Sequence, residues 1–135
     1  MKFFFSIYIV ITSYLYYQIQ KEKTLEESIS DGKIIYQDFC IQCHLGSGEG
    51  VAGTFPPLNK SDYLLKNIDK SIYSIKFGLK GKIIVNEIEY DGIMLNQGLE
   101  NEEIADVMNY IINSWENNLK IKITEKRVSQ VIKWS

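Results

Sequence analysis

The sequence Cys40-Ile41-Gln42-Cys43-His44 contains both cysteines and the only histidine of this chain of 135 residues. Two thiols separated by two residues and followed directly by an imidazole are typical of the covalent attachment of a c-type haem. In that arrangement the thiols add to the two vinyl groups of the porphyrin, and the adjacent histidine binds the iron from one face. We therefore expect Cys40 and Cys43 to attach one haem c and His44 to be an axial ligand of its iron.

The same residue types also occur in other kinds of site. A thioredoxin-like dithiol normally begins a helix that follows a strand, whereas this motif ends a predicted helix and precedes a loop with four glycines within residues 46–53. A zinc site made only of Cys and His needs four ligands, and only three such side chains are present. A chance match, a structural disulfide and a thiol oxidoreductase stay open, and mass spectrometry that detects a haem adduct on both cysteines would exclude the thiol oxidoreductase.

Length and composition indicate one globular domain. The chain has 135 residues, and single domains usually have ~100–150. Hydrophobic residues make up 45% and charged residues 24%, which is normal for a folded protein. The net charge is −2, from 15 basic and 17 acidic residues, so no basic excess is available to bind a phosphate backbone and nucleic acid is not an expected partner.

The N-terminal segment differs from the rest of the chain. Lys2 is followed by an uncharged stretch, rich in Phe, Ile and Tyr, that extends to residue 19. A positive residue before such a stretch is typical of a secretory signal peptide, and the stretch is slightly shorter than the ~20 residues that cross a bilayer easily. An Ala-x-Ala cleavage site is missing, because the first alanine is Ala52.

These features predict a division of the chain into three parts. Residues 1–20 are expected to be a signal peptide or an uncleaved membrane anchor, residues 21–29 a linker, and residues 30–135 the haem domain. Because covalent haem attachment occurs outside the cytoplasm, we expect this domain in the periplasm or on the outer face of the cytoplasmic membrane. If they are retained, residues 3–19 would tether the domain to the membrane.

Hydrophobic spacing predicts two main helices in the haem domain. Apolar residues recur at helical intervals over residues 28–43, and Ser28-x-x-Asp31 has the form of a capping box. A second, stronger apolar stripe follows Asn101 and extends to Trp115, so Asn101 is the expected N-cap of a long helix. The shorter predicted elements are a helix capped by Ser61, a helix that stops near Gly78 or Gly81, a hairpin over residues 82–90 around Asn86-Glu87, and a final helix capped by Thr124.

The order of several motifs resembles the class I c-type cytochromes. The first motif, Gly32-x-x-x-Tyr36-x-x-x-Cys40-x-x-Cys43-His44, is similar to the N-terminal helix of that family. The second, Tyr90-x-Gly92-x-Met94, is similar to its methionine loop. Residues 103–111 are similar to its C-terminal helix. The run Asn113-Ser114-Trp115-x-Asn117 is similar to a bacterial subgroup found beside or fused to nitrite reductases and other periplasmic oxidoreductases.

This resemblance implies an all-α cytochrome c fold. Three main helices and several short helices would surround one covalently attached haem, with a small hairpin near residues 82–90. The first and last helices would cross closely at Gly32, which has no Cβ. The carbonyl of Pro56 would accept a hydrogen bond from the second nitrogen of His44, and Leu58 would pack on the haem face.

The candidate sixth ligands of the iron are the methionines. Met1 belongs to the expected export segment, and Met108 lies within the apolar stripe of the last helix, where a methionine is most often a core residue. Met94 lies in a loop with Gly92 and stands where the family places its ligand, so the resemblance assigns Met94 to the iron. A lysine or a water molecule is the alternative, because Leu95 replaces the proline that usually follows this methionine.

A haem whose two axial positions are filled by the protein has no open site for a substrate, and its iron cycles between the ferrous and ferric states. We therefore expect a one-electron carrier, not an enzyme, without catalytic residues. Its expected partners are exported or membrane-bound redox proteins that bind transiently at the exposed haem edge. The alternative is a haem-based sensor or ligand-binding protein with a labile or open sixth position, which the replacement of proline by Leu95 supports.

Overall fold

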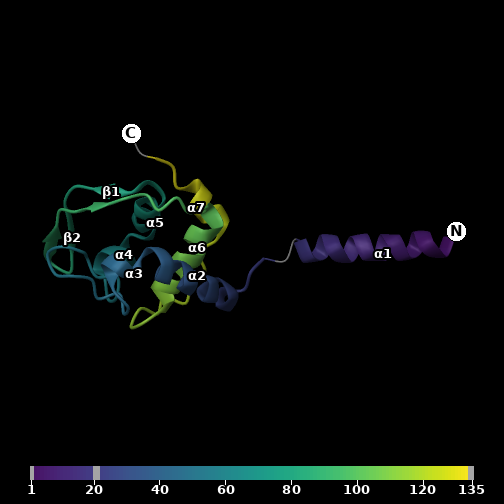
Figure 1. The fold of residues 1–135 in the computed structure, drawn as a ribbon, viewed down its shortest axis with the longest axis horizontal. Coiled ribbons are helices and arrows are strands. Elements are labelled where there is room, and N and C mark those ends of the chain that lie inside the picture. The colour runs from purple at the N-terminus through teal and green to yellow at the C-terminus, as the bar shows by residue number, and fades with distance from the viewer. Residues whose placement is uncertain (1, 20–21, 134–135) are drawn as a thin grey trace.

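The computed structural model describes residues 2–19 and 22–133 (Figure 1). Just over half of the chain is helical, as the sequence predicts. The helices are α1 (Lys2–Ile19), α2 (Leu25–Phe39), α3 (Ile41–His44), α4 (Asp62–Lys66), α5 (Ile68–Phe77), α6 (Asn101–Asn113) and α7 (Glu125–Gln130). Four short strands accompany them: β1 (Leu79–Lys80), β2 (Ile83–Val85), β3 (Ile88–Tyr90) and β4 (Ile93–Met94). The expectation of an all-α fold is therefore only approximately right.

Helix α1 extends away from the packed part of the chain (Figure 1). All of its side chains that the structure describes are exposed, including Phe4 and Tyr8. Across residues 2–19 and 22–133, no helix combines the length and hydrophobicity that a membrane crossing requires.

The core forms where α2 crosses α6 (Figure 1). At the crossing, a Cβ on Gly32 would overlap the backbone carbonyl of Asp106, so only glycine permits this separation of the helices. Tyr36 is buried beside the crossing, and its ring contacts Tyr110 and Trp115 at centroid distances of 5.4 and 5.3 Å. The fully buried residues of α6 are Ile104, Val107, Met108, Asn109 and Ile112. The predicted role of Gly32 in a close crossing is confirmed.

The start of α2 differs from the prediction. The capping box is formed by Thr24 and Glu27, four residues before the expected Ser28 and Asp31, and the helix begins at Leu25. The expected linker over residues 21–29 is therefore helical from residue 25 onward, and its first residue, 21, lies outside the described part of the chain. Thr24-x-x-Glu27 matches the usual Ser/Thr-x-x-Glu form of the motif better, so a stronger signal was present in the sequence.

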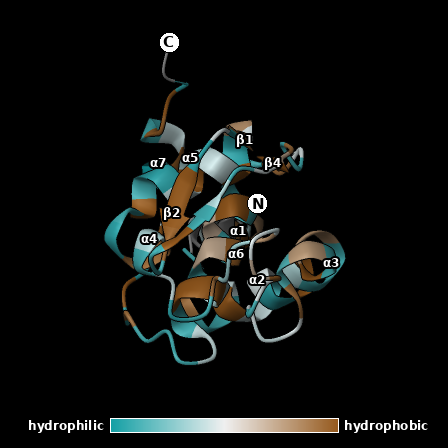
Figure 2. Ribbon diagram, turned by 90° about the vertical axis from the view of Figure 1, so that its left-hand side faces the viewer, coloured by the Kyte–Doolittle hydropathy of each residue, from teal (hydrophilic) through white to brown (hydrophobic). Residues whose placement is uncertain are grey.

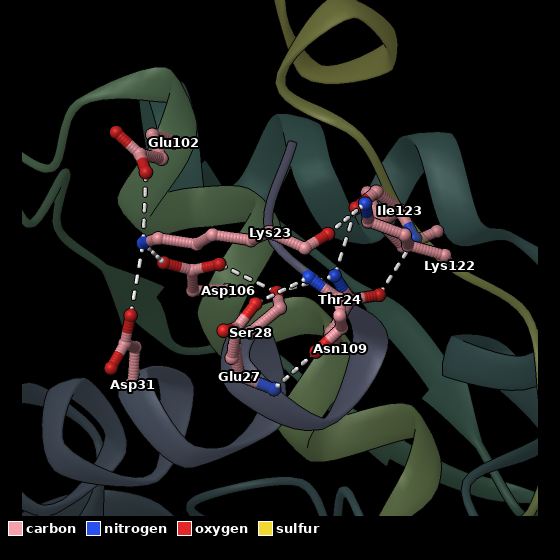
Figure 3. Close-up of polar contacts among 10 residues, drawn as sticks. All are labelled: Lys23, Thr24, Glu27, Ser28, Asp31, Glu102, Asp106, Asn109, Lys122 and Ile123. Atoms are coloured by element: carbon pink, nitrogen blue, oxygen red, sulfur yellow. Dashed lines mark hydrogen bonds and ion pairs between the residues drawn. The ribbon is translucent and has the colours of Figure 1, made fainter. Parts of the chain in front are cut away.

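A polar cluster joins the start of α2 to α6 (Figure 3). The ammonium group of Lys23 lies 2.8 Å from Asp106, 2.8 Å from Glu102 and 3.0 Å from Asp31. Burial alone would lower the pKa of Lys23, but its bonds to these three carboxylates outweigh burial and raise it. The charged form of Lys23 is therefore strongly favoured in the folded protein.

In the same cluster, hydrogen bonds of the Asn109 side chain attach the segment before α7 to α6. The side chain of Asn109 accepts a 2.6 Å hydrogen bond from the amide of Ile123 and donates to the carbonyl of Ile123 at 2.8 Å and to the hydroxyl of Ser28 at 2.8 Å (Figure 3). Lys122 donates a hydrogen bond to the backbone carbonyl of Lys23. Segments from both ends of the domain thus meet on α6.

Several predicted local features are confirmed. Ser61 caps α4 and Thr124 caps α7, because each hydroxyl accepts a hydrogen bond from a backbone amide of the first turn. Strands β2 and β3 pair antiparallel around Asn86 and Glu87, which have φ values of 50° and 66°. Two successive positive φ angles are typical of a type I′ hairpin turn. The N-cap of α6 is Glu100 and not the expected Asn101.

Candidate functional site

His44 is placed for ligand binding by the short helix α3 and by the extended segment that follows the glycine-rich loop. Its side chain is only 8% exposed, and its Nδ1 lies 2.9 Å from the carbonyl oxygen of Pro56. Burial lowers the pKa of His44, and the bond to Pro56 offsets part of this effect. The imidazole is therefore neutral at neutral pH, with Nδ1 donating to Pro56 and Nε2 free to bind a metal.

Cys40 is the N-cap residue of α3, and Cys43 lies within this helix directly before His44. Cys40 is half-buried, Cys43 is exposed, and they are not joined by a disulfide bond. Burial raises the pKa of the Cys40 thiol to about 11. A buried thiol with a high pKa is a poor nucleophile at neutral pH, so Cys40 is not suited to attack a disulfide.

A central cleft adjoins these residues and consists of two neighbouring cavities of about 610 and 540 Å³, volumes that include solvent at their openings. Five residues line both cavities: His44, Pro56, Leu79, Ile83 and Met94. Cys40, Leu58 and Met108 also line the first cavity, and Cys43 lines the second. The cleft thus brings together all six residues that the sequence singled out, from three separate segments of the chain: residues 40–44, 56–58 and 94.

Met94 enters the cleft from strand β4. It pairs with Leu79 of β1 in a two-stranded antiparallel sheet, which was not predicted. The backbone carbonyl of Met94 would lie 2.8 Å from a Cβ at Gly78, whose φ of 84° favours glycine. The loop after Met94 has its own hydrogen bonds, from Gln97 to the carbonyl of Leu95 and from Gly98 to the side chain of Asn96.

Met108 lies fully buried in the core, as predicted. It also lines the wall of the first cavity, which hydrophobic spacing alone could not show. Two tyrosines that the sequence does not single out as site residues, Tyr63 and Tyr90, line the cleft as well. The alternation of β3 carried a signal for Tyr90, since this residue lies on the buried side of the hairpin.

The cleft fits a haem in its chemistry. Its described lining residues include no Asp, Glu, Lys or Arg, so the walls suit a large apolar ring. A buried neutral imidazole and a thioether are ligands that bind haem iron in cytochromes c, and both line the same cleft beside two thiols.

Comparison with known proteins agrees with this geometry. The family model "Cytochrome c" matches residues 29–115. The chain belongs to the cytochrome c family. The cytochrome c match begins within α2 and ends just after α6, so it contains the whole cleft. Members of this family carry covalently attached haem c and are electron-transfer proteins, not enzymes.

Two relatives illustrate the range of these cytochromes. The chain is 37% identical over 98 residues to cytochrome c-552 of Thermus thermophilus, and the match covers 69% of this chain and 74% of that protein. It is 34% identical over 85 residues to the Cbb3-type cytochrome c oxidase subunit FixP of Bradyrhizobium diazoefficiens, covering 59% of this chain and 28% of that subunit. The resemblance to the subgroup associated with nitrite reductases stays a prediction.

Proposed function

We propose that this cytochrome c is a one-electron carrier with a single haem attached through Cys40 and Cys43 and ligated by His44 and Met94. The observation that carries the proposal is the central cleft, which His44 and Met94 line together over both of its cavities. When bound, the haem supplies one-electron chemistry at its iron. The protein's part is to supply the ligands and to exclude water.

The hydrogen bond between His44 and Pro56 supports the role of His44. A carbonyl acceptor fixes the orientation of a ligating imidazole and increases its basicity. Pro56 is held in place because the amide of Val51 donates to Phe55 at 2.8 Å and the amide of Leu58 donates to Gly48 at 2.7 Å. Leu58 follows within the first cavity, where its side chain would pack on the haem face.

The thioether of Met94 sets the direction of the reduction potential. A soft, neutral sulfur ligand favours ferrous iron, so ligation by His and Met raises the potential relative to a second nitrogen or oxygen ligand. The apolar walls act in the same direction, because burial in a medium of low dielectric disfavours the additional positive charge of the ferric state.

We further propose that residues 1–20 direct export and that the haem domain works in the periplasm or on the outer face of the cytoplasmic membrane. The uncharged stretch after Lys2 and the exposed side chains of α1 support this proposal. The partners would be exported or membrane-bound redox proteins that bind transiently where Cys43 reaches the surface. If α1 is retained as a tether, it raises the effective concentration of the carrier near membrane partners. N-terminal sequencing of the mature protein distinguishes a cleaved signal peptide from a retained tether.

Expression of the full chain in a host that exports and matures c-type cytochromes tests the main proposal. Mass spectrometry should show one haem bound to both cysteines, and the reduced protein should bind carbon monoxide slowly at neutral pH. Free thiols on the exported protein would contradict haem attachment. Rapid carbon monoxide binding would instead favour a sensor with an open sixth position, the alternative that Leu95 supports.

A further inference from the structure

Two Asp-Gly pairs occur in the chain, Asp31-Gly32 and Asp91-Gly92, and no asparagine is followed by glycine. An aspartate before glycine can rearrange its backbone spontaneously when the next amide nitrogen attacks the side-chain carboxyl group, since glycine has no side chain to obstruct the approach. The reaction requires an amide that is free to move and a carboxyl group that is free of partners. The surroundings of the two pairs therefore decide which of them reacts.

Asp31-Gly32 is enclosed where α2 crosses α6. Gly32 is buried inside α2, so its amide donates a hydrogen bond within the helix. The carboxylate of Asp31 pairs with the ammonium group of Lys23 at 3.0 Å. A Cβ at Gly32 would overlap the backbone carbonyl of Asp106, which leaves no space for a change in the backbone. This pair can react only when the start of α2 opens.

Asp91-Gly92 has the opposite surroundings. It connects β3 to β4, and both of its residues are exposed. Within residues 22–133, the amide of Gly92 has no hydrogen-bond partner, and the carboxyl group of Asp91 has neither a hydrogen bond nor an ion pair. A Cβ at Gly92 would meet one atom, the carbonyl oxygen of Thr54, at an ordinary contact distance of 3.5 Å. The amide and the carboxyl group are therefore free to approach each other.

We propose that Asp91-Gly92 is a site of spontaneous isoaspartate formation and that this modification releases Met94 from the iron. The nitrogen of Gly92 attacks Cγ of Asp91 and forms an N–Cγ bond, and one carboxyl oxygen leaves as water, which closes a five-membered succinimide ring. Water then adds to the backbone carbonyl carbon of Asp91 and breaks its bond to the Gly92 nitrogen. The main chain now passes through Cγ, the former carbonyl carbon is the free carboxylate, and the net charge is unchanged.

The position of the pair gives the modification an effect on the cleft. The β-linked residue adds one methylene to the main chain shortly before Met94. Strands β1 and β4 have two residues each and pair only Lys80 with Ile93 and Leu79 with Met94, so few bonds hold the register against a longer connection. Figure 2 shows β1 and β4 at one end of the domain, away from α2. The core should therefore keep its packing while Met94 moves.

The rearrangement itself needs no haem, whereas the release of Met94 rests on the proposed function. The test incubates the exported, haem-loaded protein at physiological temperature and analyses its peptides by electron-transfer fragmentation, which distinguishes isoaspartate from aspartate of equal mass. Isoaspartate should accumulate at residue 91 at least about tenfold faster than at residue 31, because residue 31 reacts only after local opening of α2. Equal rates at the two positions would overturn the assignment of the site.

The effect on the iron is measured on the same samples, through the far-red band of ferric iron bound to sulfur and the rate of carbon monoxide binding. The parent should lose the band, and bind carbon monoxide faster, in proportion to its content of isoaspartate. The variant Asp91→Glu keeps the charge but would have to close a six-membered ring, which forms more slowly, so its band should persist. Asp31→Glu is the matched control and should age like the parent.

The possible failures are distinguishable. A freshly prepared parent without covalent haem or without the far-red band would contradict the proposed function, and the comparison of residues 91 and 31 would still test the modification site. Absence of isoaspartate at residue 91 would overturn the site itself. If isoaspartate forms there and the aged parent keeps the same band as aged Asp91→Glu, the release of Met94 is overturned.

Discussion

Ser28 donates a 2.5 Å hydrogen bond to Asp106 across the interface between α2 and α6, and both side chains are buried. Asp106 also receives the ammonium group of Lys23 at 2.8 Å on its second carboxylate oxygen. The same aspartate contributes its backbone carbonyl to the contact with Gly32. One residue of α6 therefore determines both the separation of the two helices and the position of the chain before α2.

Replacement of Lys23 by methionine should destabilise the haem-loaded protein at pH 7. Removal of the ammonium group leaves the buried Asp106 with Ser28 as its remaining side-chain donor, which should cost about 1–3 kcal/mol. Denaturant unfolding monitored by circular dichroism measures the change. The control is Lys60→Met. Lys60 forms an ion pair with Glu116 in which both side chains are exposed, so its loss should cost about 0–1 kcal/mol.

The contribution of Lys23 should also depend on pH. Its pKa is higher in the folded protein than its usual value of 10.5. A raised pKa stabilises the fold fully below the unfolded pKa, and this stabilisation is lost as the pH rises through the folded pKa. The difference in stability between the parent and Lys23→Met should therefore be constant from pH 6 to 9 and decrease above about pH 10.5. A difference that decreases already between pH 6 and 9 would contradict this assignment.

Replacement of Gly32 by alanine should force α2 and α6 apart. The new Cβ would overlap the Asp106 carbonyl and approach the Val107 amide, and such overpacking costs about 1–3 kcal/mol. Gly46→Ala is a matched control, because a Cβ there meets no atom within 4 Å and its effect should remain within about 0.5 kcal/mol. Equal unfolding midpoints for the two variants would show that the helices adjust without strain.

Replacement of Met94 by alanine should change the iron site and not the core. We expect a lower reduction potential, loss of the weak far-red absorption band of ferric iron bound to sulfur, and rapid carbon monoxide binding. Met108→Ala should leave that band in place and lower the stability by about 2–5 kcal/mol, because Met108 is fully buried. The opposite pattern in the two variants would show that Met94 is not the ligand.

Replacement of Asn109 by alanine should detach the segment before α7. The amide and carbonyl of Ile123 would each lose a partner, which should cost about 1–3 kcal/mol per buried group. Hydrogen exchange at the Ile123 amide should increase more than exchange in the middle of α6. Unchanged protection at Ile123 would mean that packing of Ile123 and Val128 holds the segment without the side chain of Asn109.

Local patterns predicted much of this fold. The apolar stripe of α6, the caps at Ser61 and Thr124 and the hairpin turn at Asn86-Glu87 depend on neighbours within a few residues, so spacing and turn chemistry were sufficient. The pairing of β1 with β4 depends on a contact between residues 79 and 94, and strands of two residues are too short to show alternation.

The candidate site divides in the same way. The spacing of the cysteines and the histidine within residues 40–44 is sufficient to predict haem attachment. Pro56 and Met94 are predicted as site residues only because the order of motifs resembles a known family. The partners of Ser28 and the inward position of Tyr63 depend on which helices meet. A polar residue in a helical pattern gives no sign of such burial, so the sequence predicts a cap at Ser28, whereas the structure shows a buried donor to Asp106.

The pairing of β1 with β4 holds Met94 in place through backbone hydrogen bonds. Leu95 stands where the family resemblance leads one to expect a proline, and Met94 is instead fixed by its register with Leu79 and its contact with Gly78. In the proposed carrier, the backbone of Met94 would then keep its position in both oxidation states of the iron. Such a site has a small reorganisation energy, so electrons can enter and leave rapidly even when the driving force between partners is slight.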